Sequence, residues 1–138
     1  MIYVDSSAWV ALYRAEEDRT FLIRTILATM SWQVAGTRLV QVETERNLAL
    51  RAGDTTQAEL HLEDFRHAWQ GVEQIDIDDD TWELARQLAI TTRLRAPDAI
   101  HLAALERLGV QGALLLTFDR ALAQAAHDRG FGVVGGAI

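Results

Sequence analysis

The sequence contains no cysteine and no lysine, and it has one proline and nine glycines in 138 residues. Without cysteine the chain forms no disulfide and offers no thiolate, so a bound metal would be held by oxygen or histidine, which favours hard cations. Glycine and proline are sparse, and there is no repeat, linker or low-complexity stretch. We therefore expect a single domain of alternating strands and helices over residues 1–138.

Long apolar runs are also missing. No stretch approaches the roughly 20 apolar residues that a membrane-spanning helix needs. The first five residues lack the basic and then apolar plan of a signal peptide. These absences predict a cytoplasmic protein without a membrane anchor.

Positive charge is scarce, because 13 basic residues face 20 acidic ones and the net charge is −7. This balance argues against a polyanionic partner. Metal ions bound by several of the acids would weaken the objection, since bound cations reverse the sign of the local field. All of the positive charge is carried by arginine, which grips phosphate through two hydrogen bonds. A compositional bias of the genome is the simpler explanation for the missing lysine, so arginine content alone identifies no partner.

Hydrophobic periodicity and capping residues predict alternating elements along the whole chain. The expected strands cover residues 2–4, 33–35, 72–77, 113–117 and 132–134, and the expected helices cover 8–13, about 21–27, 38–52, 55–69, 81–92, 97–108 and 120–127. Such alternation predicts a three-layer α/β/α sandwich around a short, mainly parallel sheet. In these sheets the ligand site lies at the carboxyl ends of the strands.

Two aspartates directly follow predicted strands. Asp5 comes after the first strand and Asp119 after the fourth, so both fall at the expected ligand edge of the sheet. Each is also a favourable N-cap for the helix that follows. Near Asp5, either Ser6 or Ser7 would serve as an alternative cap and would leave the Asp5 carboxylate free to point into a cleft. The acidic run at 76–80, by contrast, is interpreted as a solvated turn and helix start.

Glu43 is placed unusually for an acid. On a helical wheel it lies within the apolar arc of its predicted helix. That arc is marked by Leu39, Val40, Val42 and Leu50. A carboxylate on a face meant for burial is costly unless it is paired or bound to a cation. A structural ion pair with Arg46 is the alternative, although an exposed pair contributes little.

Asp98 lies in the first turn of the helix predicted over 97–108, where the helix dipole favours an acid. It shares a face with Leu102 and Leu105, so we expect its side chain to point toward the sheet. His101 lies one turn further along the same helix. A lone histidine on an apolar helix is better interpreted as a packed, hydrogen-bonded core residue than as a metal ligand.

The motifs around these acids resemble those of the PIN-domain nucleases, and within them the VapC-like toxins of bacterial toxin–antitoxin pairs. The resemblance spans essentially the whole chain. It rests on residues 3–8 (YVDSSA), 39–46 (LVQVETER), 94–103 (LRAPDAIHLA) and 116–122 (LTFDRAL). The third segment is the most specific, and the order and spacing of all four strengthen the assignment.

The resemblance implies an Mg²⁺- or Mn²⁺-dependent endoribonuclease that forms homodimers and is blocked by a small antitoxin protein. It implies that catalysis and metal binding rest on an acidic quartet formed by Asp5, Glu43, Asp98 and Asp119. Thr117 would be a supporting hydroxyl that orients a carboxylate or a water molecule. Some relatives carry a further acid directly after the last aspartate, where this chain has Arg120. Whether the site would bind one metal ion or two therefore remains open.

Three other functions remain open. The same fold could serve as a catalytically silent scaffold that binds RNA or a protein, or as a housekeeping nuclease without a toxin role. A third alternative is phosphoryl transfer through an aspartyl phosphate at Asp5. Phosphatases of that kind carry a second aspartate two residues later, where this chain has Ser7.

Overall fold

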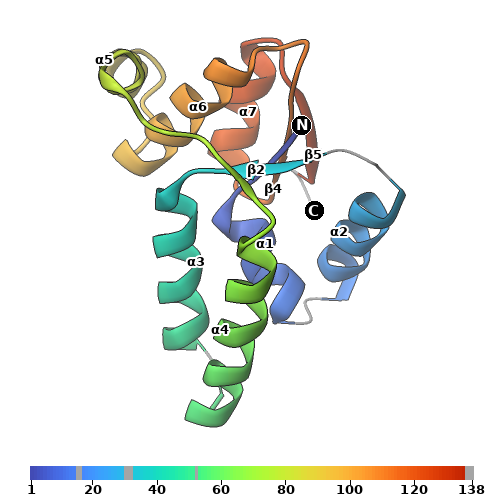
Figure 1. Cartoon of the computed structure of the whole chain (residues 1–138). Coiled ribbons are helices and arrows are strands. Elements are labelled where there is room, and N and C mark those ends of the chain that lie inside the picture. The colour runs from blue at the N-terminus through green and yellow to red at the C-terminus, as the bar shows by residue number, and fades with distance from the viewer. Residues whose placement is uncertain (15–16, 30–32, 52, 136–138) are drawn as a thin grey trace.

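The computed structural model describes residues 1–14, 17–29, 33–51 and 53–135. In this part of the chain the strands form one parallel sheet in the order β3-β2-β1-β4-β5, and helices flank it (Figure 1). The strands are β1 (Ile2–Val4), β2 (Val34–Gly36), β3 (Glu73–Gln74), β4 (Leu114–Thr117) and β5 (Gly132–Gly135). The helices are α1 (Ser6–Tyr13), α2 (Glu17–Thr29), α3 (Arg38–Arg51), α4 (Thr55–Trp69), α5 (Asp79–Thr91), α6 (Ala96–Leu108) and α7 (Arg120–Asp128).

The first strand of the chain lies at the centre of the sheet. Ile2 of β1 is in register with Val34 of β2 on one side and Leu114 of β4 on the other. All three residues of β1 are buried, as expected for a parallel strand covered on both faces. The Asp5 backbone N–H donates to the Leu116 carbonyl at 3.2 Å, which holds the end of β1 beside the end of β4.

Helices α1, α2, α3 and α4 pack against one another as one group. Figure 1 shows α3 and α4 side by side and antiparallel, so the two helices form a hairpin. Aromatic rings join α4 to α1: Trp9 meets Phe65 edge-on at 5.3 Å between ring centres and Trp69 at 6.3 Å. Such aromatic contacts add to the burial that anchors the hairpin.

The remaining helices form a second group. Helix α5 packs on α6, α6 packs on α7, and α7 contacts β4 and β5. Helix α6 is the most deeply buried of these, since five of its residues from Ala99 to Leu105 are at most 1% exposed. The predicted α/β/α fold class with a mainly parallel sheet is therefore confirmed (Figure 1).

Some element ends differ from the prediction. Strand β3 covers only Glu73 and Gln74 instead of 72–77, and both side chains are exposed. An edge position that buries neither residue gains little from further pairing. The chain then turns into α5, which begins at Asp79 because Asp78 caps it and accepts from the Thr81 N–H at 2.8 Å. The predicted end of the 38–52 helix at Ala52 lies outside the described residues.

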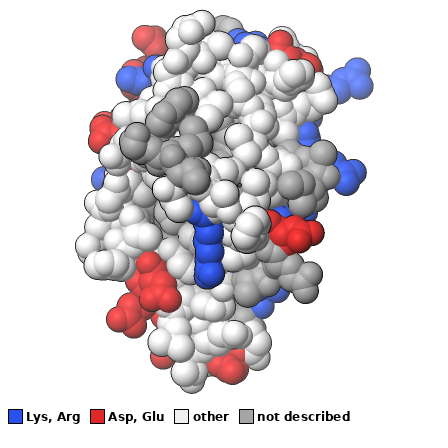
Figure 2. All heavy atoms as spheres, turned by 90° about the vertical axis from the view of Figure 1, so that its right-hand side faces the viewer, with Lys and Arg blue, Asp and Glu red and all other residues white. Residues whose placement is uncertain are grey.

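The surface shows no obvious division by charge on the face seen in Figure 2. Acidic and basic side chains lie in small groups around a largely uncharged centre that one arginine crosses. On this face, as far as its side chains are described, positive charge is not gathered into one patch. None of the described helices combines the length and the apolar character that crossing a bilayer requires.

Candidate active site

Asp5 ends β1 and is itself the N-cap of α1. Its Oδ1 accepts from the Ala8 N–H at 3.2 Å and from the Ser7 hydroxyl at 2.6 Å, while its Oδ2 accepts from the Thr117 hydroxyl at 2.6 Å. Of the two capping alternatives that the sequence left open, the structure shows Asp5, and not Ser6 or Ser7, as the cap. Ser7 instead links two segments, because its Oγ also accepts from the Phe118 N–H at 2.9 Å.

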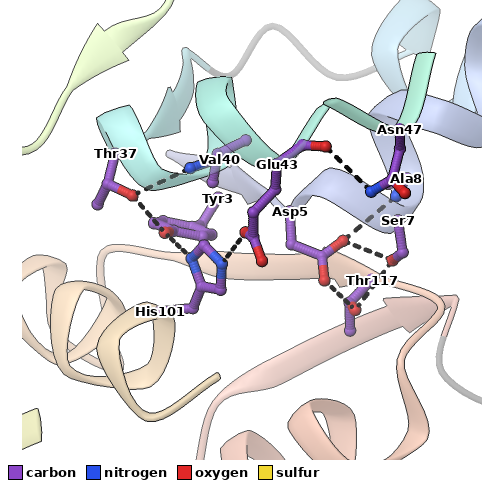
Figure 3. A network of polar contacts seen from close by, with 10 residues as sticks. All are labelled: Tyr3, Asp5, Ser7, Ala8, Thr37, Val40, Glu43, Asn47, His101 and Thr117. Carbon is purple, nitrogen blue, oxygen red and sulfur yellow. Dashed lines mark hydrogen bonds and ion pairs between the residues drawn. The ribbon is translucent and has the colours of Figure 1, made fainter. Parts of the chain in front are cut away.

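Asp119 repeats this arrangement at the end of β4. It caps α7, and its Oδ1 accepts from the Leu122 N–H at 2.9 Å. The Asp119 N–H donates to Thr117 Oγ1 at 3.0 Å. The buried Thr117 hydroxyl therefore donates to Asp5, as Figure 3 shows, and accepts from the Asp119 N–H. Capping a helix and belonging to a common site are thus compatible roles for both aspartates.

Glu43 projects from α3 toward α6. Its Oε1 lies 2.5 Å from His101 Nε2, and His101 Nδ1 lies 2.7 Å from the Tyr3 hydroxyl (Figure 3). The Glu43 side chain is 26% exposed, whereas that of His101 is 2% exposed. His101 is packed and hydrogen-bonded, as its sequence context predicted, but its partner is an acid of the predicted quartet.

The burial of α3 corrects the helical-wheel argument for Glu43. Val42 and Leu50, which marked the supposed inner arc, are 62% and 66% exposed. The buried positions are Val40, Thr44 and Leu48. Glu43 flanks this stripe, and its partner among the described residues is His101 rather than Arg46. The buried face of α3 was predicted wrongly from residue type, because a helix exposes some aliphatic side chains wherever no neighbouring element covers them.

Asp98 lies in the first turn of α6 and is half-buried, on the helix that also carries the fully buried Leu102 and Leu105. Burial and the charges of Asp119, Glu43 and Asp5 together raise the pKa of Asp98 to about 6, while His101 acts in the opposite direction. Charges influence one another in this way only over short separations, because water and salt screen them. The structure therefore brings the other three predicted acids within electrostatic reach of Asp98.

Asp5 is the most buried member of the quartet, with 4% of its surface exposed. Burial raises its pKa, and the hydrogen bonds from Ser7 and Thr117 act in the opposite direction. Hydrogen bonds to a carboxylate favour its charged form, whereas desolvation favours the neutral form. Asp5 is thus held in place by donors that also make its charge tolerable.

The donor set suits a hard divalent cation, since it consists of carboxylate oxygens, and Asp5 Oδ2, which accepts only from Thr117 among the bonds described above, has a further lone pair. The oxygens do not form a ready coordination shell. Among the described residues, no three acidic or histidine side chains converge closely enough to hold a metal ion. Asp5 is turned toward Thr117 and Ser7, Glu43 toward His101, and Asp119 toward the start of α7. The fit to a metal therefore rests on charge and donor type.

Ser7, Tyr3 and Thr37 belong to the site's hydrogen-bond network but were not predicted to do so. The place of Ser7 at the start of a helix, close to Asp5, is a partial indication in the sequence that it contacts Asp5. No such indication exists for Tyr3 and Thr37, since their partners lie far away in the chain.

Comparison with known proteins identifies the family of this chain. The family model described as "PIN domain" matches residues 2–128. Two curated relatives from Mycobacterium tuberculosis are Ribonuclease VapC46, which is 32% identical over 96% of this chain and 95% of its own length, and Ribonuclease VapC47, which is 33% identical over 95% and 93%.

Solved structures share the fold. VapC20 from Mycobacterium tuberculosis, described as a sarcin–ricin loop cleaving toxin, superposes with a TM-score of 0.71 at 24% identity and covers 91% of this chain and 95% of its own. A toxin–antitoxin complex from Klebsiella pneumoniae gives 0.70 at 20% identity, with 97% and 96% covered. At these identities the likeness concerns the fold. The family model and the curated relatives together show that the chain belongs to the PIN-domain family and to its VapC branch.

Proposed function

We propose that this chain is a divalent-metal-dependent endoribonuclease and the toxin of a toxin–antitoxin pair. The observation that carries the proposal is that burial and the charges of Asp119, Glu43 and Asp5 raise the pKa of Asp98. Acids that repel one another in one pocket favour the binding of a cation. The ribonuclease names of relatives that align over nearly the whole chain support the same activity.

The four acids would hold Mg²⁺ or Mn²⁺. When bound, such an ion lowers the pKa of a water molecule and offsets the charge that develops on a phosphodiester during hydrolysis. Carboxylate oxygens match the preference of both ions. The chain contains no cysteine that would favour softer metals.

The chain's own residues orient the acids. Ser7 and Thr117 fix the two oxygens of Asp5, and Thr117 also ties Asp5 to the backbone of Asp119. Asp98 carries its full charge only above pH about 6. Cleavage is therefore expected to increase as the pH rises through this value.

Purified protein incubated with a panel of defined RNAs tests the activity. We expect cleavage with Mg²⁺ or Mn²⁺ and none after chelation by EDTA. Asp98→Asn should reduce kcat/KM at least about 100-fold, since a metal ligand contributes several kcal/mol and each 1.4 kcal/mol is about tenfold. Asp78→Asn is the matched control, because Asp78 also lies at a helix start but outside the quartet.

Absence of cleavage by the wild type with every RNA and both metals would favour the silent scaffold. Cleavage by Asp98→Asn at the wild-type rate would show that the activity comes from a contaminant or from another site. Either result overturns the proposed activity.

The toxin role predicts a small protein partner encoded next to this chain, as well as a cytoplasmic location where RNA and partner are made. The solved toxin–antitoxin complexes of the same fold support such a partner. Expression of this chain alone should arrest growth. Co-expression of the protein encoded by the neighbouring gene should relieve the arrest, and that protein should co-purify with this chain. A cleaving enzyme without either effect would be a housekeeping nuclease.

The resemblance to this family also implies a homodimer. Light scattering of the purified chain measures its mass in solution and tests this expectation.

A further inference from the structure

Four side chains from distant segments form a buried line that ends at Glu43. The Thr37 and Tyr3 hydroxyls lie 3.4 Å apart, Tyr3 lies 2.7 Å from His101 Nδ1, and His101 Nε2 lies 2.5 Å from Glu43 Oε1 (Figure 3). Thr37 and Tyr3 are fully buried and His101 is nearly so. The line joins β1, the segment between β2 and α3, α6 and α3.

Each group along this line contacts the next. Within the described part of the chain, Thr37 Oγ1 contacts the Val40 N–H, which donates to it, and the Tyr3 hydroxyl. The Tyr3 hydroxyl contacts His101 Nδ1, and His101 Nε2 faces Glu43 Oε1. Because a carboxylate only accepts hydrogen bonds, Nε2 is the donor in this last contact.

Burial raises the pKa of Tyr3, so its hydroxyl keeps its hydrogen beside His101. The His101 ring is thus held from one side by Tyr3 and faces Glu43 on the other.

Glu43 needs such a restraint. Its side chain is long and one-quarter exposed on the flank of α3, so without a partner it would sample several rotamers. The bond to His101 engages Oε1, and Figure 3 shows the carboxylate on the side of the site where Asp5 lies. Residues that orient the ligands of a metal commonly influence its affinity as strongly as a ligand does.

We propose that His101, oriented by Tyr3 and Thr37, is a positioning residue that holds the Glu43 carboxylate in the site through its Nε2–H. The inference deepens the proposed nuclease function, because the effect on cleavage depends on that function. The hydrogen-bond arrangement itself is independent of it.

Nitrogen NMR of the full chain with labelled histidine tests the arrangement without any activity. The His101 signals are assigned by their loss in His101→Gln. We expect Nε2 to carry a hydrogen at neutral pH, as the contact with Glu43 requires. A bare Nε2 would overturn the proposal.

Variants test the consequence for the site. His101→Leu removes the donor, and it should weaken Mn²⁺ binding measured by calorimetry and lower kcat by about 10- to 100-fold, with KM for RNA unchanged. His101→Gln keeps an N–H near the position of Nε2 and should restore most of both properties. His67→Leu is the control, because His67 is exposed on α4.

Tyr3→Phe provides a second variant if His101→Leu does not fold. It retains the ring and removes the hydroxyl that orients His101, so the NMR signals should show mixed tautomers and Mn²⁺ affinity should fall about tenfold. Wild-type Mn²⁺ affinity in both His101→Leu and Tyr3→Phe would overturn the proposal. A wild type that binds Mn²⁺ and shows the Nε2–H form but cuts no RNA would overturn the nuclease assignment alone.

Discussion

Two aspartates at helix starts have opposite electrostatic surroundings. The pKa of Asp78, the cap of α5, is lowered to about 2 because the Thr81 hydroxyl and N–H donate to it and Arg107 pairs with it. The pKa of Asp98, in the first turn of α6, is raised to about 6 by burial and by the charges of other acids. The helix dipole favours a negative charge in both places.

The contrast shows that the helix start alone does not decide how an acid titrates. At Asp78 the surroundings supply donors and a guanidinium, so the charge is stabilised within the protein. At Asp98 they supply further negative charge, so the ionised state is left partly uncompensated. The cation site proposed above accordingly lies at the sheet edge and not in the more acidic-looking segment 76–80.

Removing the most buried acid should have the largest effect on this contrast. Asp5→Ala leaves the Ser7 and Thr117 hydroxyls and the Ala8 N–H without their acceptor, so we expect the free energy of unfolding to fall by about 3 kcal/mol. Asp5→Asn keeps an acceptor and should cost less than about 1 kcal/mol. Urea denaturation measures both. Equal stability of the two variants would contradict the geometry of the site.

Divalent ions should sharpen the difference between the two regions. Mn²⁺ at 100 times its dissociation constant should stabilise the wild type by about 2.7 kcal/mol, which raises Tm by roughly 5 to 10 °C. Asp98→Asn should reduce this shift, and Asp78→Asn should preserve it. Thermal unfolding with and without Mn²⁺ provides the measurement. A shift unaffected by Asp98→Asn would place the ion elsewhere.

The pH dependence of stability should reveal the sign of the Asp98 shift. In the folded metal-free protein Asp98 binds a proton up to pH about 6, whereas the unfolded chain releases it near pH about 3.9. Stability should therefore fall as the pH rises from about 4 to 6, by about 1 kcal/mol once screening of this half-exposed group is included. The measured quantity is the difference in unfolding free energy between wild type and Asp98→Asn with EDTA present. A difference that favours the wild type as pH rises would contradict the assignment.

Asp78 should give the smallest effect, with the opposite sign. Because its folded pKa is lowered, its contribution is present above pH about 4 and disappears as the pH falls through about 2. Asp78→Asn keeps the cap and removes the charge, so its Tm should lie slightly below that of the wild type at pH 7. The two values should converge at low pH. Added salt should narrow the gap as well, since the pair with Arg107 is exposed.

Local patterns were sufficient for most of the fold. Helix α4 begins and ends where its apolar spacing predicted, and the apolar run of β4 is a buried strand. The predicted end of β3 at residue 77 was wrong, because the length of an edge strand depends on how many backbone groups of the neighbouring strand are available for pairing. The sequence left open whether Asp5 or a serine caps α1, because its local pattern suits both, and the bond from the distant Thr117 to Asp5 is not visible in it.

The quartet was proposed from motifs and their spacing, and the structure brings three of these acids within electrostatic reach of Asp98. The groups that hold them could not be predicted in the same way. His101 contacts Glu43 across a separation of 58 residues, and Tyr3 contacts His101 across 98. Such contacts depend on how α3 and α6 pack on the sheet. A single sequence does not contain that information in any local window.

The position of β1 also affects how the protein is made. This strand is synthesised long before one of its two partners, β4, which begins at Leu114. The centre of the sheet therefore stays incomplete until β4 has been translated, because pairing between distant segments waits for the later one. Asp98 is made shortly before β4, and Asp119 shortly after it. A nascent chain that has not yet reached residue 98 thus lacks half of the acidic quartet.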